Sequence, residues 1–402
     1  MWRSALRRTT LAATLGAVLT AASGCADGTP ALDSDAVASV PLAGEGAYDR
    51  AALEAARLDR SWWEWAERDR LSRRGARAPS GIGVDAGRAV RPAIAETWEQ
   101  ITPETTGRPP ALPVDGGAGP SVLHIQILLD RVGFSPGVID GRWGKNTEKA
   151  VYWFQQRHGL ETTGTVDTAT YDRLAIGAGD RPLVERYTLT AADLEGPFVD
   201  IPEDVYERAE LDCLCYQSPW ERLAERFHSA PELLERLNPT VSPRSLRTGT
   251  TLWVPAVRRA DEPPAGTIAR IIVSRKGYYT HALDAGGRIV LHFPSTLGSA
   301  YSPSPEGELS VASITFDPHF HYQPKLFHEV PDEEPEAMLP PGPNSPVGVV
   351  WMQLSEPHLG IHGTSEPETI GYATSHGCVR LTNWDARLLA QHTRPGTPVE
   401  FR

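Results

Sequence analysis

Apolar residues change their spacing several times along the chain, and each change predicts a new module. Between residues 51 and 74, leucines and tryptophans recur at helical spacing among charged residues, which indicates a helix with one packing face. We interpret the tryptophans at 62–65 as core or a docking surface and not as a ligand site. Residues 75–120 are rich in Gly, Pro and Ala, which is typical of a linker with short structured pieces. From 121 to 174 the helical period returns three times.

The final third of the chain, residues 266–402, has the pattern of β-strands instead. Short runs of β-branched and aromatic residues are separated by glycine-containing turns. These runs predict strands at 271–273, 278–283, 289–293, 347–354 and 398–401. A helix is expected over Asn383–His392, with Thr382 or Asn383 as its N-cap. This part of the chain is therefore predicted to be a β-rich domain.

Composition and charge exclude several classes of protein. The 402 residues carry 39 Lys and Arg against 51 Asp and Glu, a net charge of −12, whereas nucleic-acid binding needs basic side chains that neutralise phosphates. Four cysteines are too few for a disulfide scaffold. Beyond the N-terminus, no apolar run approaches the ~18 residues of a membrane span. At roughly 100–200 residues per domain, the length predicts two to four domains.

The N-terminus has the pattern of an export signal. Arginines precede an apolar run of 14 residues, Thr9–Ala22, which is too short for a stable membrane anchor and is followed by Ser23-Gly24-Cys25. Residues 1–24 are therefore a predicted signal peptide, and the small, polar residues 25–47 a tether. The string Ala-Ala-Ser-Gly-Cys resembles a bacterial lipobox, with Ala where the family usually has Leu. This resemblance implies lipidation of Cys25 and a membrane-anchored lipoprotein of the periplasm or cell envelope. An ordinary cleavage site with an incidental cysteine is the alternative.

The helical region at 118–178, which follows the helical segment and linker of 48–117, carries a spaced set of polar and glycine residues. Gln126 lies in the first predicted helix, Asp140-Gly141-x-x-Gly144 in the next loop, and Thr147 and Phe154-Gln155 in the second helix. Together they closely resemble the signature of the small three-helix peptidoglycan-binding domain. The resemblance implies a module that holds the protein on peptidoglycan. A bare helical bundle with capping glycines is the alternative.

Residues 186–257 resemble a LysM module, a small α/β fold, less closely. The pattern predicts a strand, two helices and a closing strand at 187–189, 220–227, 233–237 and 252–255. A long insert at 190–217 replaces the short Gly-Asp-Thr turn of that family, so glycan binding and a structural role both stay open. The insert contains Cys213 and Cys215, which can pair with each other in an oxidising compartment, stay free, or pair between molecules.

The last domain combines one cysteine with two histidines in the strings His362-Gly363-Thr364 and Ser375-His376-Gly377-Cys378-Val379-Arg380. An ordinary cysteine has a pKa of about 8.5 and is mostly thiol at neutral pH. A neighbouring imidazole that takes the thiol proton therefore makes the sulfur a nucleophile. Gly377 permits a tight bend that opens the sulfur to a carbonyl, and an amide N–H at or next to Cys378 can face an oxyanion. Arg380 can hold a substrate carboxylate.

Zinc binding is the competing interpretation, because His and Cys are preferred ligands of that metal. No second cysteine lies nearby, and Ser-His-Gly-Cys does not have the usual ligand spacing. His319, His321 and His328 form another cluster, for which a polar loop is the simpler explanation. We therefore predict no metal site.

The strings at 362–364 and 375–380 resemble the catalytic motif of the L,D-transpeptidases, the YkuD family. Two further segments resemble that family: the Pro-Gly-Pro-Asn-x-Pro-x-Gly string at 341–348, and Ser304-Pro305-Glu306-Gly307, with Ser in place of Thr. The resemblance spans residues 266–402 and implies a β-sandwich-like catalytic domain. The whole chain is then a multidomain α+β protein.

Carried over residue by residue, the resemblance makes Cys378 the nucleophile and His362 the general base, with the Gly363 carbonyl orienting the imidazole. It places His376 in the catalytic pocket as well. It assigns substrate binding to the remaining residues: Arg380, Ser375, Gly377 and Asn344.

The family attacks the carbonyl of the L-centre of meso-diaminopimelate in a tetrapeptide stem, expels the terminal D-alanine and transfers the acyl group to an amine. The resemblance implies peptidoglycan as partner, an envelope protein as a second acceptor, and no metal or organic cofactor. With water as acceptor, the same residues make an L,D-carboxypeptidase or endopeptidase. A non-catalytic wall-binding protein with a relic domain is the remaining alternative.

Overall fold

The computed structural model describes residue 62 and residues 96–327, 330–331 and 333–402, all of which belong to one compact unit, Val37–Arg402. The predicted signal peptide, the tether with Cys25 and most of the predicted helix at 51–74 lie outside the described residues. Trp62 is described: it is helical and buried, and its ring meets that of Tyr152 edge to face at 5.7 Å. This contact confirms a packing role for that tryptophan.

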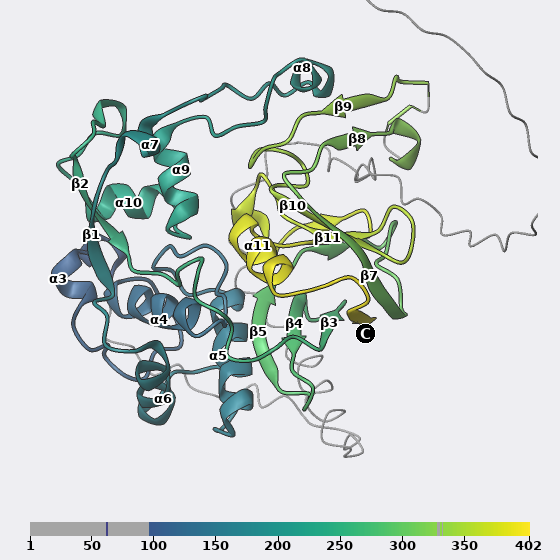
Figure 1. Cartoon of the computed structure of the whole chain (residues 1–402). Helices are drawn as coiled ribbons and strands as arrows, with labels where there is room; N and C mark the ends of the chain where they lie inside the picture. Colours follow the sequence, from purple (N-terminus) through teal and green to yellow (C-terminus); the bar gives the residue numbers. More distant parts are fainter. Residues whose placement is uncertain (1–61, 63–95, 328–329, 332) are drawn as a thin grey trace, which may run out of the picture. The chain divides into compact units, whose positions relative to one another are not determined.

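The three helices of the predicted peptidoglycan-binding region are present. They follow two short elements in the order η1 Trp98–Gln100, α3 Pro103–Thr106, α4 Pro120–Arg131, α5 Lys145–His158 and α6 Thr168–Ala178 (Figure 1). Two glutamines of the sequence signature fasten the loops between them. Gln126 donates to Asp140 Oδ1 at 3.0 Å and accepts from Gly141 N at 2.7 Å. Gln155 donates to Thr165 O at 2.7 Å, so both are buried structural clamps.

The middle region is built around a two-stranded antiparallel sheet, in which β1 Val184–Thr188 pairs with β2 Thr251–Pro255. Along the chain, the two predicted helices come between these strands as α9 Pro219–Arg226 and α10 Pro231–Leu237, followed by η2 Pro243–Ser245. The predicted insert contains α7 Ala191–Leu194 and α8 Val205–Ala209. Within the insert, Cys213 and Cys215 are joined in a disulfide.

The C-terminal region is the predicted β-rich domain. Its main sheet has the strand order β13-β11-β10-β7-β14-β3-β4-β5. Figure 1 shows β5, β4 and β3 side by side at one end of this order. The strands are β3 Arg270–Ser274, β4 Tyr279–Leu283, β5 Ile289–Pro294, β7 Gly307–Phe316, β10 Val350–Leu354, β11 Gly360–His362, β13 Val379–Arg380 and β14 Pro398–Phe401. Two separate strand pairs accompany it: β6 Leu297–Gly298 with β12 Thr374–Ser375, and β8 Phe320–Tyr322 with β9 Ala337–Leu339. The remaining elements are η3 Pro324–Leu326, η4 Pro367–Thr369 and α11 Asn383–Gln391.

In place of the expected sandwich-like arrangement, the structure has one continuous, curled sheet. The long strand β7 explains this difference, because one half of it pairs with β14 and the other half with β10. Two groups of strands are thereby joined edge to edge in a single ladder. The predicted helix α11 begins after Thr382, whose hydroxyl accepts a hydrogen bond from Asp385 N at 3.3 Å, so Thr382 is the N-cap.

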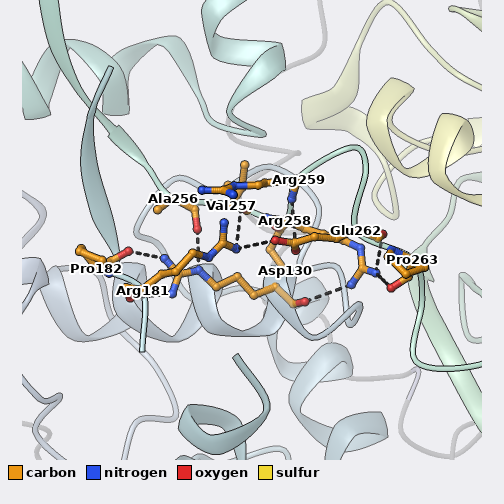
Figure 2. A network of polar contacts seen from close by, with 10 residues as sticks. Asp130, Arg181, Pro182, Ala256, Val257, Arg258, Arg259, Glu262 and Pro263 are labelled. Atoms are coloured by element: carbon orange, nitrogen blue, oxygen red, sulfur yellow. Dashed lines mark hydrogen bonds and ion pairs between the residues drawn. The ribbon is translucent and has the colours of Figure 1, made fainter. Parts of the chain in front are cut away.

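Polar contacts link the helical and middle regions and the segments that flank the middle region. Asp130 accepts the backbone N–H of Arg258 at 2.7 Å, and Arg181 forms an ion pair with Glu262 at 3.3 Å (Figure 2). Arg131, at the end of α4, donates to the carbonyl of Ala256 at 2.5 Å. Burial lowers the pKa of this guanidinium to about 10.

The helical region also adds directly to the main sheet. Ser135 N donates to His292 O, and His292 N donates to Gly133 O, both at 2.9 Å, so the segment after α4 covers the edge strand β5. On α5, the ammonium of the fully buried Lys149 donates to Tyr278 O at 3.0 Å.

A largely buried junction joins the helical, middle and catalytic regions. It is formed by Asp130, Ser135, His228, Trp384 and Asp385. His228 Nδ1 lies 2.7 Å from Asp130 Oδ2, and its ring stacks on that of Trp384 with centroids 5.0 Å apart. The hydroxyl of Ser135 donates to Asp385 Oδ2 at 2.7 Å. These residues come from α4, the segments after α4 and α9, and α11.

In the described part of the chain, every helix is too short or too polar to cross a bilayer.

Candidate active site

Cys378 is a buried free cysteine that immediately precedes β13. Strand β13 runs parallel to β11, with Ile361 opposite Val379 and His362 opposite Arg380. This register places the two sequence strings that carry the predicted chemistry on neighbouring strands. The thiol of Cys378 is 1% exposed and lies 3.6 Å from the carbonyl oxygen of His358.

Glycine and two serines shape the turn that presents the thiol. Gly377 has φ of +115°, a conformation that residues with a Cβ rarely adopt. The hydroxyl of Ser375 donates to Cys378 O, and that of Ser304 donates to Gly377 O, both at 2.6 Å. Ser304 also accepts from Gly298 N at 2.9 Å, which ties the turn to β6. Because both serines are buried, these bonds fix the backbone on either side of the sulfur.

His362 is fully buried at the end of β11. Its Nδ1 lies 2.7 Å from the carbonyl oxygen of Gly363, and its Nε2 has no hydrogen-bond partner among the described residues. A carbonyl can only accept, so this contact selects the tautomer with hydrogen on Nδ1 and an unprotonated Nε2. The ring lies beside that of Trp351, with centroids 5.4 Å apart.

Burial dominates the electrostatics of both groups. It lowers the pKa of His362 to about 3, and the positive charge of Arg380 acts in the same direction. It raises the pKa of the Cys378 thiol to about 11, against the opposing effects of a backbone hydrogen bond from Gly360 and of Arg380. The resting site therefore holds a neutral thiol and a neutral imidazole.

Two other predicted site residues lie on β13 and in the turn before it. Arg380 is 4% exposed, and its backbone exchanges hydrogen bonds with Thr296 at 2.9 and 3.0 Å. His376 is half-buried and packs beside Phe327, with ring centroids 5.9 Å apart.

Asn344 has different surroundings. Its amide nitrogen donates to Cys215 O at 2.9 Å and to Glu221 Oε1 at 2.8 Å, so its side-chain amide is bonded to the middle region.

Two residues at this site were not singled out for function from the sequence. Asn383, expected only as an N-cap or first helical residue, accepts from Thr364 N at 3.1 Å through Oδ1. Its Nδ2 donates to Glu225 on α9 at 2.9 Å. The sequence does contain one signal that could have pointed to Glu225. Glu221 and Glu225 are four residues apart, so both carboxylates lie on one face of a predicted helix.

Metal ligands do not gather in the described part of the chain: no three His, Cys, Asp or Glu side chains there lie close enough to hold an ion. Nε2 of His321, from the second histidine cluster, lies within hydrogen-bond distance of Glu336 Oε2, at 2.8 Å.

Comparison with protein families finds two matches. The model described as "L,D-transpeptidase catalytic domain", YkuD, matches residues 268–401, and the one described as "putative peptidoglycan binding domain" matches residues 112–174. Neither matched range includes residues 189–257, so the LysM-like identity of the middle region stays a prediction.

Two curated relatives and one solved structure show the extent of the similarity. "Putative L,D-transpeptidase YkuD" of Bacillus licheniformis is 30% identical over 181 residues, 45% of this chain and 92% of the relative. The protein of the same name from Bacillus subtilis is 27% identical over 177 residues, 44% of this chain and 89% of the relative. A crystal structure of the L,D-transpeptidase of Xylanimonas cellulosilytica matches with 18% identity and a TM-score of 0.32, covering 73% of this chain and all of that one.

Proposed function

This chain belongs to the L,D-transpeptidase family, and from that premise we propose that it acylates itself at Cys378 with a peptidoglycan stem peptide and passes the acyl group to an amine. The observation that supports the proposal is that a buried thiol and a neutral imidazole, whose tautomer is set by Gly363, are held at the neighbouring parallel strands β13 and β11. That tautomer leaves Nε2 of His362 with a lone pair, which is what a general base requires.

In the first half of the reaction, His362 Nε2 takes the proton of Cys378. As that proton leaves, the sulfur attacks the carbonyl at the L-centre of diaminopimelate, and backbone N–H groups at the Gly377–Cys378 turn stabilise the oxyanion. The C–N bond to the terminal D-alanine then breaks, and the imidazolium returns its proton to the leaving amine. The product is a thioester on Cys378. Because neither group is charged at rest, proton transfer accompanies attack rather than preceding it.

In the second half, an amine attacks the thioester while His362 accepts the amine's proton; the C–S bond then breaks, and the imidazolium returns the proton to the sulfur of Cys378. An amine on another diaminopimelate gives a 3→3 crosslink, whereas a lysine on an envelope protein anchors that protein to the wall. Arg380 supplies a charge for a substrate carboxylate, while Ser375 and Gly377 shape the pocket and His376 lines it. Asn344 acts through the loop that it fastens.

The N-terminal modules serve to keep the enzyme at its polymer. A peptidoglycan-binding module tethered to a catalytic domain raises the effective concentration of stem peptides around the thiol. We place the protein in the cell envelope on this basis, with lipidation at Cys25 as the proposed anchor.

The test is mass spectrometry of a diaminopimelate-containing tetrapeptide muropeptide incubated with the protein. A crosslinked dimer that has lost D-alanine is expected with the natural chain and is absent with Cys378→Ala. The same dimer from Cys378→Ala would refute the nucleophile. A tripeptide as sole product, even after a lysine peptide is added as acceptor, would indicate a carboxypeptidase instead, and no product would favour a wall-binding protein.

His362→Ala tests the base separately. We expect it to slow formation of the thioester by on the order of 10²–10⁴-fold, as is typical for loss of a general base. Thioester formation at the natural rate would show that another group takes the proton.

A further inference from the structure

Helix α9 of the middle region presents two carboxylates to the catalytic domain. Glu221 and Glu225 lie four residues apart and therefore on one face of the helix. Asn344 donates to Glu221 Oε1 at 2.8 Å, and Asn383 donates to Glu225 Oε2 at 2.9 Å. Each carboxylate thus receives a side-chain amide from a different part of the catalytic domain.

Asn383 occupies a central position in this contact. It is 1% exposed, and its Oδ1 accepts from Thr364 N at 3.1 Å and from Val349 N at 3.3 Å. A Cβ added at Gly348 or Gly363 would come within 1.9 or 2.1 Å of the same oxygen, so both backbones need glycine to approach it. The Asn383 amide is therefore packed directly against the loop that follows His362.

That loop holds the imidazole. Gly363, which contacts Asn383, provides the carbonyl that lies 2.7 Å from His362 Nδ1, and His362 O accepts from Leu381 N at 2.9 Å. A shift of the 363–364 backbone would move this acceptor away from the ring. The orientation of Asn383 therefore influences which tautomer His362 adopts and how its ring is oriented.

Glu225 is one of the groups that fix the orientation of Asn383. An Asn side chain can be turned over with little change of shape, and the turned form would offer N–H groups to Thr364 N and Val349 N, which are donors themselves. On the other side, Nδ2 donates to the carbonyl of Pro343 at 3.2 Å as well as to Glu225. Burial raises the pKa of Glu225 to about 7, and above that pH its carboxylate can only accept from Nδ2, so it favours the form with Oδ1 toward the loop. Tyr216 OH donates to the other carboxylate oxygen at 2.9 Å and holds Glu225 in place.

We propose that Glu225 is a positioning residue for His362, acting from the middle region through Asn383 and the Gly363 carbonyl. The proposal rests on the proposed role of His362 as general base. It gives the LysM-like region a part in the reaction itself, in addition to any contact with the wall.

The experiment compares full-length natural protein with Glu225→Ala and Glu225→Gln, and uses Glu235→Ala, an exposed carboxylate on α10, as the matched control. The first readout is the ¹⁵N spectrum of histidine-labelled protein, in which His362 is assigned by its loss in His362→Ala. We expect one Nδ1–H tautomer in the natural protein and the control, and a mixture of tautomers in Glu225→Ala.

The second readout is thioester formation. Glu225→Ala is expected to lower kcat by roughly tenfold with KM nearly unchanged, because a small misplacement of a catalytic group is costly. Glu225→Gln keeps one acceptor oxygen and should recover much of that loss. If Glu225→Ala fails to fold, the Gln variant and Tyr216→Phe take its place, with smaller shifts expected in the same direction.

The outcomes separate this proposal from the proposed function. An unchanged His362 tautomer together with unchanged kcat in the folded Glu225 variants would overturn the positioning role. A mixed tautomer in a protein that has no transpeptidase activity at all would support the positioning role and count against the proposed function.

Discussion

Burial of the proposed nucleophile has a direct chemical consequence at the residue scale. Cys378 is half ionised only at a pH of about 11, and His362 is half protonated only at about 3, so both groups are mainly neutral throughout the physiological range. This differs from cysteine enzymes that rest as a thiolate and imidazolium pair. The free enzyme should thus be protected from electrophiles that lack its substrate's shape.

Alkylation tests this consequence. In the absence of substrate, the rate at which iodoacetamide modifies Cys378 should keep rising through pH 9, because the thiolate fraction is still growing there. The measurement is the rate of mass increase of the intact protein at several pH values, with Cys378→Ala showing the background from other sites. A plateau near pH 7 would mean that the thiolate is already present at rest.

Local sequence was sufficient to predict the tight bend at Gly377. The proximity of the two strings depends on the parallel pairing of β11 with β13, which the pattern of residues did not predict. Glu225 could not be found in this way. Its role depends on a contact with Asn383, 158 residues away, which no periodicity or local motif encodes.

At the scale of elements, the insert between β1 and α9 is the feature that sequence patterns described least well. Strands β3, β4 and β5 and helix α11 lie close to their predicted bounds, because runs of β-branched and aromatic residues between glycine turns mark the strands and an N-cap residue marks the start of the helix. The insert has no such signals. Its Leu214 is fully buried in the core of the catalytic domain, between the two cysteines of the disulfide.

Backbone contacts attach this insert to the Pro-Gly-Pro-Asn loop. Leu214 N donates to Pro341 O, and Asn344 N donates to Leu214 O, both at 2.9 Å. A Cβ at Gly342 would lie 2.1 Å from Leu214 O, so the absence of a side chain permits the approach. The glycine of this family-like string is explained here by packing.

Truncation of Leu214 should therefore destabilise the catalytic domain, although the residue lies outside it in sequence. Leu214→Ala is expected to lower the free energy of unfolding by roughly 2–5 kcal/mol, the usual range for a buried leucine. Chemical denaturation followed by tryptophan fluorescence measures it. Ile176→Ala, at a residue that is 73% exposed, is the control and should change little. Equal effects from both would show that Leu214 is not part of the core.

At the scale of the whole molecule, the junction of three modules makes stability depend on pH. Burial raises the pKa of Asp385 from an ordinary 3.8 to about 7. Asp130 raises the pKa of His228 above its ordinary value, despite the opposing effect of burial. In both cases the folded protein holds a proton that the unfolded chain would release.

The sign of the effect follows from that excess of protons. Between about pH 4 and 7 the folded state keeps the Asp385 proton and the unfolded state does not, so raising the pH through this range lowers the free energy of unfolding. The loss is on the order of 1.4 kcal/mol for each unit of pKa shift. The stability provided by His228 is likewise present below its unfolded pKa of about 6.5 and is lost as the pH rises through its folded value.

Asp385→Asn should make the free energy of unfolding depend less on pH, while the new amide oxygen still accepts from the Ser135 hydroxyl. Thermal unfolding at pH values from 4 to 8 measures the slope, with the exposed Asp261→Asn as control. The natural chain and the control should lose stability in parallel, and the Asp385 variant should lose less. Equal slopes in all three would contradict a raised pKa at Asp385.

The burial of Leu214 in the core of the catalytic domain also affects which recombinants of such a protein can fold. Modules joined only by linkers can be exchanged by recombination without loss of either part. Here a catalytic segment spliced to a different N-terminal partner would carry an unfilled site beside Gly342 and an unmatched amide at Asn344. Such a recombinant would need a new residue to fill that site, so selection should transmit the middle region and the catalytic domain together.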